Sequence, residues 1–176
     1  MESLFLLSKL DLGQVPFHDE CVNLSDFLQD WYQECASRYD HAVVNFHNNA
    51  PHMVQVLMDR THFIRVLDNL CQNSIKYRSA DPVHIDVTLE CDKQECILTF
   101  QDNGIGIDPS QAPRLFDSFY RSDPARSSKV KGNGLGLSIT KQIITQMKGD
   151  ISASGELNKG LCITIRLPLL QGGTTL

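Results

Sequence analysis

Two glycine-rich motifs within residues 102–137 constrain this chain more than any other feature of its sequence. The first reads Asp-Asn-Gly-Ile-Gly-Ile over residues 102–107, and the second reads Gly-Asn-Gly-Leu-Gly-Leu over residues 132–137. Glycine lets a backbone approach a ligand closely, and the start of a helix presents free N–H groups to a phosphate. Either motif alone is equally consistent with an ordinary turn. Together, and with the carboxylate of Asp102 beside them, they suit a nucleotide.

The size and charge of the chain exclude several classes of protein. Its 176 residues suffice for one domain with a sizeable core, and its 41% hydrophobic and 21% charged content is typical of a soluble globular protein. With a net charge of −5, the protein as a whole lacks the positive charge that binds nucleic acid. No apolar run approaches the roughly 18 residues that span a bilayer, and the first residues lack the basic start and cleavage site of a signal peptide. We therefore expect this domain to contact neither nucleic acid nor membrane.

The six cysteines are scattered through the chain without a C-x-x-C pair. A disulfide framework is not expected in a chain of this size with a good core, and the spacing for a zinc site is absent. Cys91 and Cys96 are placed to face each other across a predicted hairpin. Reduced, cytosolic thiols are nevertheless the expectation for all six.

Hydrophobic periodicity predicts helices that alternate with pairs of strands. The predicted helices cover residues 1–12, a segment that begins at Asn23 or Ser25, residues 61–77 and residues 135–147. The predicted strands cover residues 43–46, 53–58, 83–89, 96–101, 151–154 and 161–167, and a single helical turn is predicted at 113–119. Helices between antiparallel hairpins indicate an α+β fold, a two-layer α/β sandwich whose mixed, mostly antiparallel sheet is covered on one face by about three helices.

Three segments are less clearly defined by their sequence. Residues 1–12 form either the end of a longer element or a helix docked on this domain, and the pattern favours neither. Residues 122–131 have no periodicity and predict a mobile loop. Residues 171–176 predict a frayed tail.

The predicted helix at 61–77 carries two stripes. Its apolar stripe consists of Phe63, Val66, Leu67, Leu70, Cys71 and Ser74. A second stripe aligns Arg65, Asn69, Asn73 and Lys76 along the helix, at spacings of four, four and three. Asparagine is a poor helix former and has no capping role in mid-helix. We therefore interpret this second stripe as functional rather than as a solvated face.

The residues around the glycine motifs define a particular kind of nucleotide site. The P-loop, the complete dinucleotide pattern and the eukaryote-type kinase motifs are all absent. Asp102 follows a predicted strand, where its carboxylate can accept a hydrogen bond from the amine of adenine, whereas guanine presents a carbonyl there. The amide oxygens of Asn69 and Asn73 can reach a Mg²⁺ ion that also binds phosphates, and Lys76 can meet a phosphate.

The loop between the two glycine motifs is locally basic. It holds Arg121, Arg126, Lys129 and Lys131 against Asp123 alone. A solvated loop is the alternative. Because the basic patch leads directly into the glycine-rich start of a helix, we interpret the loop as a lid that faces phosphate.

Four motifs, in this order, resemble those of one known family. They are Asn-Leu-Cys-Gln-Asn-Ser-Ile-Lys-Tyr at 69–77 (the N box), Asp-x-Gly-x-Gly at 102–106 (the first glycine box), Leu-Phe-Asp-Ser-Phe-Tyr-Arg at 115–121 (the F box) and Gly-x-Gly-Leu-Gly-Leu at 132–137 (the second glycine box). Over about residues 20–170 the chain is similar to the catalytic, ATP-binding domain of bacterial two-component sensor histidine kinases, in the superfamily shared with gyrase, MutL and the heat-shock chaperone ATPases. The F box favours the histidine kinases over the other branches.

The resemblance implies an ATP-dependent protein-histidine kinase domain that uses ATP and Mg²⁺ and has a flexible ATP lid. Asn73 would bind the metal, Asn69 would lie by the triphosphate and Lys76 would contact a phosphate, so these three are the predicted catalytic residues. The other predicted nucleotide contacts are Tyr77, Asp102, Gly104, Gly106, Ile107, Tyr120, Arg121, Lys131, Gly132, Gly134, Leu135, Gly136 and Leu137.

The resemblance also implies a longer parent protein. Residues 1–16 would be the end of a dimerisation helix and a linker, residues 17–170 the catalytic domain, and residues 171–176 the tail. The phospho-accepting histidine would lie upstream, on the dimerisation and histidine-phosphotransfer domain of a homodimeric, membrane-anchored parent, with this domain in the cytoplasm and a response regulator as an indirect partner. Two alternatives stay open: a degenerate nucleotide-sensing or protein-interaction module, and a gyrase-like ATPase.

Four positions depart from the usual pattern of the family. Ser74 stands where Ala is common, and Ser118 where a basic residue or Pro is frequent. Leu161 and Ile163 replace the Thr or Ser and the Phe often found after Gly160. None of these changes removes the predicted metal ligand, the base-reading carboxylate or a motif glycine.

Overall fold

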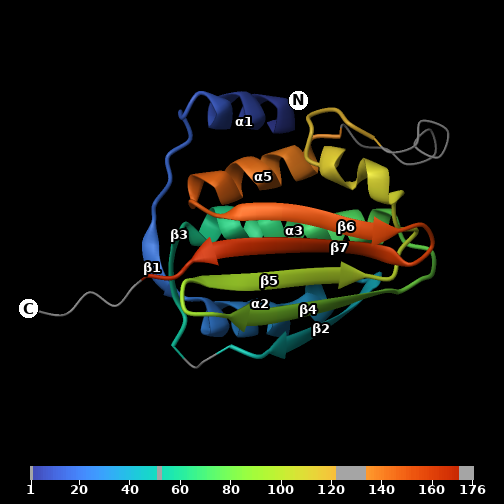
Figure 1. The fold of residues 1–176 in the computed structure, drawn as a ribbon, viewed down its shortest axis with the longest axis horizontal. Helices are drawn as coiled ribbons and strands as arrows, with labels where there is room; N and C mark the ends of the chain where they lie inside the picture. The colour runs from blue at the N-terminus through green and yellow to red at the C-terminus, as the bar shows by residue number, and fades with distance from the viewer. Residues whose placement is uncertain (1, 51–52, 122–133, 171–176) are drawn as a thin grey trace, which may run out of the picture.

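The protein is a two-layer α+β sandwich, as predicted (Figure 1). The computed structural model describes residues 2–50, 53–121 and 134–170. Its main sheet has five strands, which in spatial order are β2 (Ala42–Asn48), β4 (Val83–Cys91), β5 (Glu95–Asp102), β7 (Gly160–Pro168) and β6 (Asp150–Glu156). β2 and β4 run parallel, and the other neighbouring strands run antiparallel.

Three helices pack on one face of this sheet: α2 (Leu24–Arg38), α3 (Arg60–Lys76) and α5 (Gly136–Gln146) (Figure 1). All six residues of the predicted apolar stripe on α3 are buried. In β4, burial alternates with the pleat, so that Val83, Ile85, Val87 and Leu89 face the helices. The apolar faces of sheet and helices therefore form a single core.

The N-terminal helix α1 (Glu2–Asp11) packs against α5 on the side away from the sheet (Figure 1). Leu7 and Leu10 are buried in this contact, and Gln142 Nε2 donates a hydrogen bond of 2.8 Å to Asp11 Oδ1. Helix α1 is thus docked on this domain.

One predicted hairpin is wrong. The predicted strands at 43–46 and 53–58 do not pair with each other, because β2 joins the main sheet and β3 (Gln55–Met58) pairs antiparallel with β1 (Glu20–Asn23) in a separate two-stranded sheet. β1 was not predicted, since four residues are too few to show a period. It is held in place by the pairing of Val22 with Val56, which are both buried.

The helical turn predicted at 113–119 is also wrongly placed. A 3₁₀ helix, η1 (Pro109–Arg114), begins earlier, because the Asp108 side chain caps it by accepting a hydrogen bond of 2.9 Å from Ser110 N. The predicted mobile loop at 122–131 and the predicted tail at 171–176 lie outside the described residues.

No helix in the described part of the chain is both long enough and apolar enough to cross a membrane.

Candidate functional site

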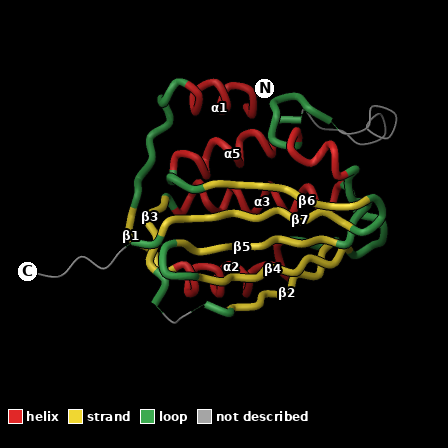
Figure 2. Tube along the Cα trace, in the orientation of Figure 1, coloured by secondary structure: helices red, strands yellow, loops and turns green. Residues whose placement is uncertain are grey.

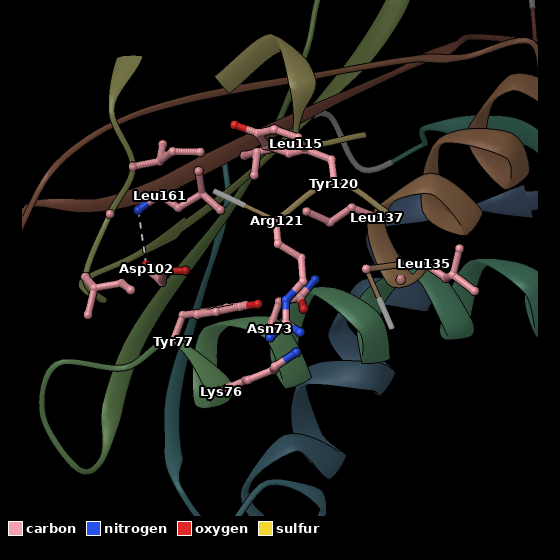
Figure 3. Close-up of a pocket in the computed structure, with 15 residues that line it drawn as sticks. Asn73, Lys76, Tyr77, Asp102, Leu115, Tyr120, Arg121, Leu135, Leu137 and Leu161 are labelled. Atoms are coloured by element: carbon pink, nitrogen blue, oxygen red, sulfur yellow. Dashed lines mark hydrogen bonds between the residues drawn. The ribbon is translucent and has the colours of Figure 1, made fainter. Parts of the chain in front are cut away.

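The ends of β5 and α3, the β6–β7 turn and the start of α5 gather at one end of the sheet (Figure 2). Between them lies a cavity of about 340 Å³. Its lining residues are Asn73, Lys76, Tyr77, Asp102, Ile105, Gly106, Ile107, Leu115, Tyr120, Arg121, Gly134, Leu135, Gly136, Leu137 and Leu161 (Figure 3). Segments far apart in the sequence thus contribute to one pocket.

The carboxylate of Asp102 is fixed at one end of this pocket and is 8% exposed. Its Oδ1 accepts hydrogen bonds from Gly104 N at 2.9 Å and from Leu161 N at 3.1 Å, and its Oδ2 accepts one of 2.7 Å from the Ser74 hydroxyl. Leu161 is placed there because β5 and β7 are neighbours, with Gln101 opposite Cys162. The carboxylate therefore has three donors from three separate segments.

Glycines allow the backbone segments around Asp102 to pass very close to one another. At Gly106, where φ is +65°, a Cβ atom would lie 1.9 Å from Glu156 O. At Gly160, where φ is +93°, it would lie 1.8 Å from Asp102 O. These two glycines let the backbone segments cross closely beside Asp102, and Gly106 also lines the pocket.

Gly104 has a similar role and is not among the lining residues. A Cβ atom there would lie 2.7 Å from Tyr77 O, and the next residue, Ile105, donates a backbone hydrogen bond of 3.0 Å to that same oxygen. Gly104 thus lets the loop after β5 attach to the end of α3.

Asn69, Asn73 and Lys76 of the polar stripe on α3 lie in two places, in the pocket and at the contact with α5. Asn73 and Lys76 line the pocket, with Lys76 Nζ 5.0 Å from the centre of the Tyr77 ring. Asn69 is not among the lining residues. Its amide instead donates hydrogen bonds of 3.3 Å to Gly136 O and to Thr140 Oγ1, and so connects α3 with the first turn of α5.

The start of α5 forms the opposite wall. A Cβ atom at Gly136 would find its nearest neighbours 3.9–4.0 Å away, at the side chains of Asn69 and Asn73, so this glycine leaves open space beside those amides. Gly134 has a φ of +65°, and its carbonyl accepts a hydrogen bond of 3.0 Å from Phe119 N. That bond joins Phe119, which precedes the basic loop, to Gly134, which follows it.

The two ends of the pocket differ in chemistry. Apolar side chains line much of the pocket, and sequence reasoning missed three of them as site residues, Ile105, Leu115 and Leu161. Leu115 and Leu161 do follow recognisable signals, the start of the F box and the position after Gly160, whereas Ile105 resembles any core residue.

At the other end, the side chains of Lys76 and Arg121 bring positive charge beside a neutral amide. Figure 3 shows the Arg121 side chain reaching toward Asn73, close to Lys76. An apolar slot that ends in a carboxylate, joined to a cationic end at a helix N-terminus, fits an adenine and a chain of phosphates. The predicted contacts Lys131 and Gly132 lie outside the described residues.

Magnesium binds few protein oxygens and keeps waters and phosphates as its other ligands. The pocket includes the side-chain amide of Asn73, which lies near Gly136, and an amide group of this kind can supply an oxygen that fits such an ion. The described residues contain no group of three or more His, Cys, Asp or Glu side chains that would hold a metal by themselves.

Comparison with known proteins gives consistent results. Residues 58–171 match the family model described as histidine kinase-, DNA gyrase B-, and HSP90-like ATPase. Over 174 residues the chain is 33% identical to the sensor histidine kinase WalK of Bacillus subtilis, an alignment that covers 96% of this chain and 28% of WalK. The chain thus spans less than a third of the length of this curated relative.

Solved structures share the fold. Full-length ShkA in complex with AMPPNP superposes with a TM-score of 0.80 at 20% identity, covering 99% of this chain and 36% of ShkA. The mycobacterial sensor histidine kinase MprB superposes with a TM-score of 0.70 at 24% identity, covering 86% of this chain and 97% of the MprB chain.

Proposed function

Because the chain belongs to the family of histidine kinase-, DNA gyrase B- and HSP90-like ATPases, we propose that its pocket binds Mg-ATP and donates the γ-phosphoryl group to a histidine of a sensor kinase. The accepting histidine belongs to a dimerisation and histidine-phosphotransfer domain. No histidine lines the pocket that the described residues form, so the nucleophile comes from outside it.

The observation that carries this proposal is the hydrogen bonding of Asp102. An ionised carboxylate has about four acceptor sites, and three are occupied by Gly104 N, Leu161 N and the Ser74 hydroxyl. The remaining site on Oδ2 can accept a hydrogen bond from the exocyclic amine of adenine. Guanine presents a carbonyl there and leaves this fourth acceptor site without a donor, and a hydrogen bond to a charged group contributes about 1.5–3 kcal/mol.

The cationic end of the pocket would hold the phosphates. Lys76 and Arg121 supply positive charge, and the first N–H groups of α5 supply donors at Gly136 and Leu137. Asn69 acts indirectly, since its bonds to α5 fix the position of that helix start. Asn73 would hold the magnesium ion, which neutralises phosphate charge when bound.

In this reaction the domain positions ATP and forms no covalent bond with the transferred group. In the transfer, the bond between the γ-phosphorus and the bridging oxygen of ATP breaks, a bond from phosphorus to an imidazole nitrogen forms, and ADP leaves. Charge spreads over the γ-phosphoryl oxygens in the transition state, so fixed cations such as Lys76 and Arg121 stabilise it.

The chain is one part of a larger proposed assembly. Residues 17–170 form the catalytic domain, and residues 1–16 connect it to the dimerisation helices of the parent. The parent is a membrane-anchored homodimer with this domain in the cytoplasm, and a response regulator receives the phosphoryl group from the histidine. The identity with WalK, a sensor histidine kinase, supports this placement.

Transfer of a labelled phosphoryl group tests the proposal. The full chain is mixed with γ-labelled ATP, magnesium and a separately purified dimerisation domain from a sensor kinase, and acid-labile label on that domain is measured. Label that depends on Asn73 and on magnesium is expected. ATP binding without any transfer would instead favour a non-catalytic nucleotide-sensing module, and steady hydrolysis without an acceptor would favour a gyrase-like ATPase.

A further inference from the structure

Cys91 and Cys96 face each other across the β4–β5 hairpin. Cys91 is the last residue of β4, Cys96 is the second of β5, and the two are direct cross-strand partners. One residue beyond them, Asp92 N donates a hydrogen bond of 3.0 Å to Glu95 O. In an antiparallel ladder this places the cysteines at a non-hydrogen-bonded pair, where the two Cα atoms approach to about 4.5 Å.

The two thiols are already in contact. The Cys91 thiol donates a hydrogen bond to Cys96 Sγ, with 2.8 Å between the sulfur atoms. Both cysteines are free thiols. A disulfide generally requires Cα atoms about 4.4–6.8 Å apart, so this strand pairing accepts a cross-link without movement of the backbone.

The two thiols differ in accessibility. Cys96 is buried with 1% of its surface exposed, whereas Cys91 is half-buried at the rim of the same core. Burial raises the pKa of both thiols, so both are protonated at neutral pH. Cys91 is therefore the sulfur that a reagent in solution reaches first.

We propose that Cys91 and Cys96 form a reversible redox dithiol, which a low-molecular-weight disulfide oxidises to an intramolecular disulfide. The Cys91 thiol loses its proton as its sulfur attacks the reagent, the S–S bond of the reagent breaks, and a mixed disulfide forms while the released sulfur takes up the proton and leaves as one small thiol. The Cys96 sulfur then attacks Cys91 Sγ and expels the second small thiol. The protein loses two S–H hydrogens, and the reagent is reduced to two thiols.

The cross-link closes the short loop between the end of β4 and the start of β5, which is remote from the pocket. Cys96 and Asp102 lie six residues apart along β5, which corresponds to about 20 Å of strand. The same turn also contacts the end of β7, where Leu169 N donates a hydrogen bond of 2.9 Å to Gln94 O. Oxidation would thus stiffen the hairpin and leave the nucleotide site unchanged.

The test uses the full chain with Cys21→Ser and Cys162→Ser, because those two thiols are also accessible. The reduced protein is incubated with oxidised glutathione, and its intact mass and its non-reduced peptides are measured. We expect a mass loss of two hydrogens, a peptide that joins Cys91 to Cys96, reversal by dithiothreitol, and a melting temperature higher by roughly 4–8 °C.

Two single variants are matched controls. Cys96→Ser should keep a glutathione adduct at Cys91, and Cys91→Ser should react slowly or not at all. A stable glutathione adduct on Cys91 of the protein that retains Cys96, or a cross-link between Cys35 and Cys71 instead, would overturn the proposal. Because the readout is covalent, it does not depend on nucleotide binding.

Discussion

The hydroxyl of Ser74 donates a hydrogen bond of 2.7 Å to Oδ2 of Asp102, inside the core and between α3 and the end of β5. Ser74 is 3% exposed and Asp102 is 8% exposed, so little water competes for either group. Alanine is common at the position of Ser74 in the histidine kinases that the chain resembles. This chain has therefore added a third donor to the carboxylate that we expect to read adenine.

Replacement of Ser74 by Ala should lower the free energy of unfolding by about 1–2 kcal/mol, because a buried carboxylate loses one of its donors. Urea unfolding at neutral pH measures this loss. Ser138→Ala is a matched control, since Ser138 is also buried but bonds to a neutral carbonyl, Leu135 O, at 2.9 Å. The smaller loss should occur at Ser138, and an equal or greater loss there would contradict the charged hydrogen bond.

Gly136→Ala should weaken ATP binding without unfolding the protein. The added Cβ atom fits against the protein, 3.9 Å from Asn69 Oδ1, but it takes up the open space at the start of α5. Since alanine is the better helix former, stability should stay the same or rise, by up to about 1 kcal/mol. Overpacking of about 1–3 kcal/mol corresponds to a loss of affinity of roughly 5- to 140-fold. Calorimetric titration with ATP and thermal unfolding measure both effects, and unchanged affinity would place the phosphates elsewhere.

Gly160→Ala should destabilise the fold severely. Its φ is +93°, and the new Cβ atom would lie 1.8 Å from Asp102 O, which is a backbone atom that cannot move aside. Gly13→Ala has a comparable φ of +63° with no atom within 4 Å, so it isolates the conformational term, of about 1 kcal/mol. A loss of more than about 3 kcal/mol is expected at Gly160 alone. Urea unfolding measures the loss of stability in both variants. Similar losses would mean that the backbone contact between Gly160 and Asp102 O is not tightly packed.

Asp59→Asn should destabilise the protein in a pH-dependent way. Burial by itself raises the pKa of Asp59, but hydrogen bonds from His18 N at 2.8 Å and His62 N at 2.9 Å outweigh it, so the pKa lies below its usual value. A carboxyl whose pKa is lower in the folded state stabilises the fold above the unfolded pKa, near about 4, and this contribution disappears as the pH falls through the folded pKa. Since Asp59 caps α3, the difference from wild type should be about 1–2 kcal/mol at neutral pH.

Chemical unfolding at a series of pH values checks the Asp59 prediction. The difference between the two proteins should shrink below about pH 4, where the wild-type carboxyl gains its proton. A difference that is constant from neutral to acid pH would show that the shape of the side chain, and not its charge, is what matters.

Local patterns in the sequence were sufficient to predict the α-helices of the described residues, though not the position of the 3₁₀ helix η1. The apolar stripe of α3 was identified in full, from Phe63 to Ser74, because helical spacing places its members on one face. The polar stripe likewise placed Asn73 and Lys76 in the pocket. The same reasoning could not separate Asn69 from them, since only the position of α5 determines that its amide bonds to Gly136.

Pairings between distant segments could not be predicted from local patterns. The strands around residues 43–58 looked like a hairpin, but β2 pairs in parallel with β4, and this long-range choice has no local signature. The donors to Asp102 from Ser74 and Leu161 also come from segments far along the chain. The role of Gly160 was not predicted for the same reason, since only the folded chain reveals its close approach to Asp102 O.

Titration of the full chain with ATP, with and without magnesium, tests the central claim most directly. We predict that binding requires magnesium, that ATP binds more tightly than GTP, and that Asp102→Asn lowers the affinity for ATP by roughly 10- to 100-fold, in keeping with the loss of a charged hydrogen bond. The ATP and GTP comparison uses the wild-type protein, so it stands even if the variant folds poorly. Equal affinity for ATP and GTP in wild type, or ATP binding that ignores both magnesium and the Asp102 substitution, would contradict the account.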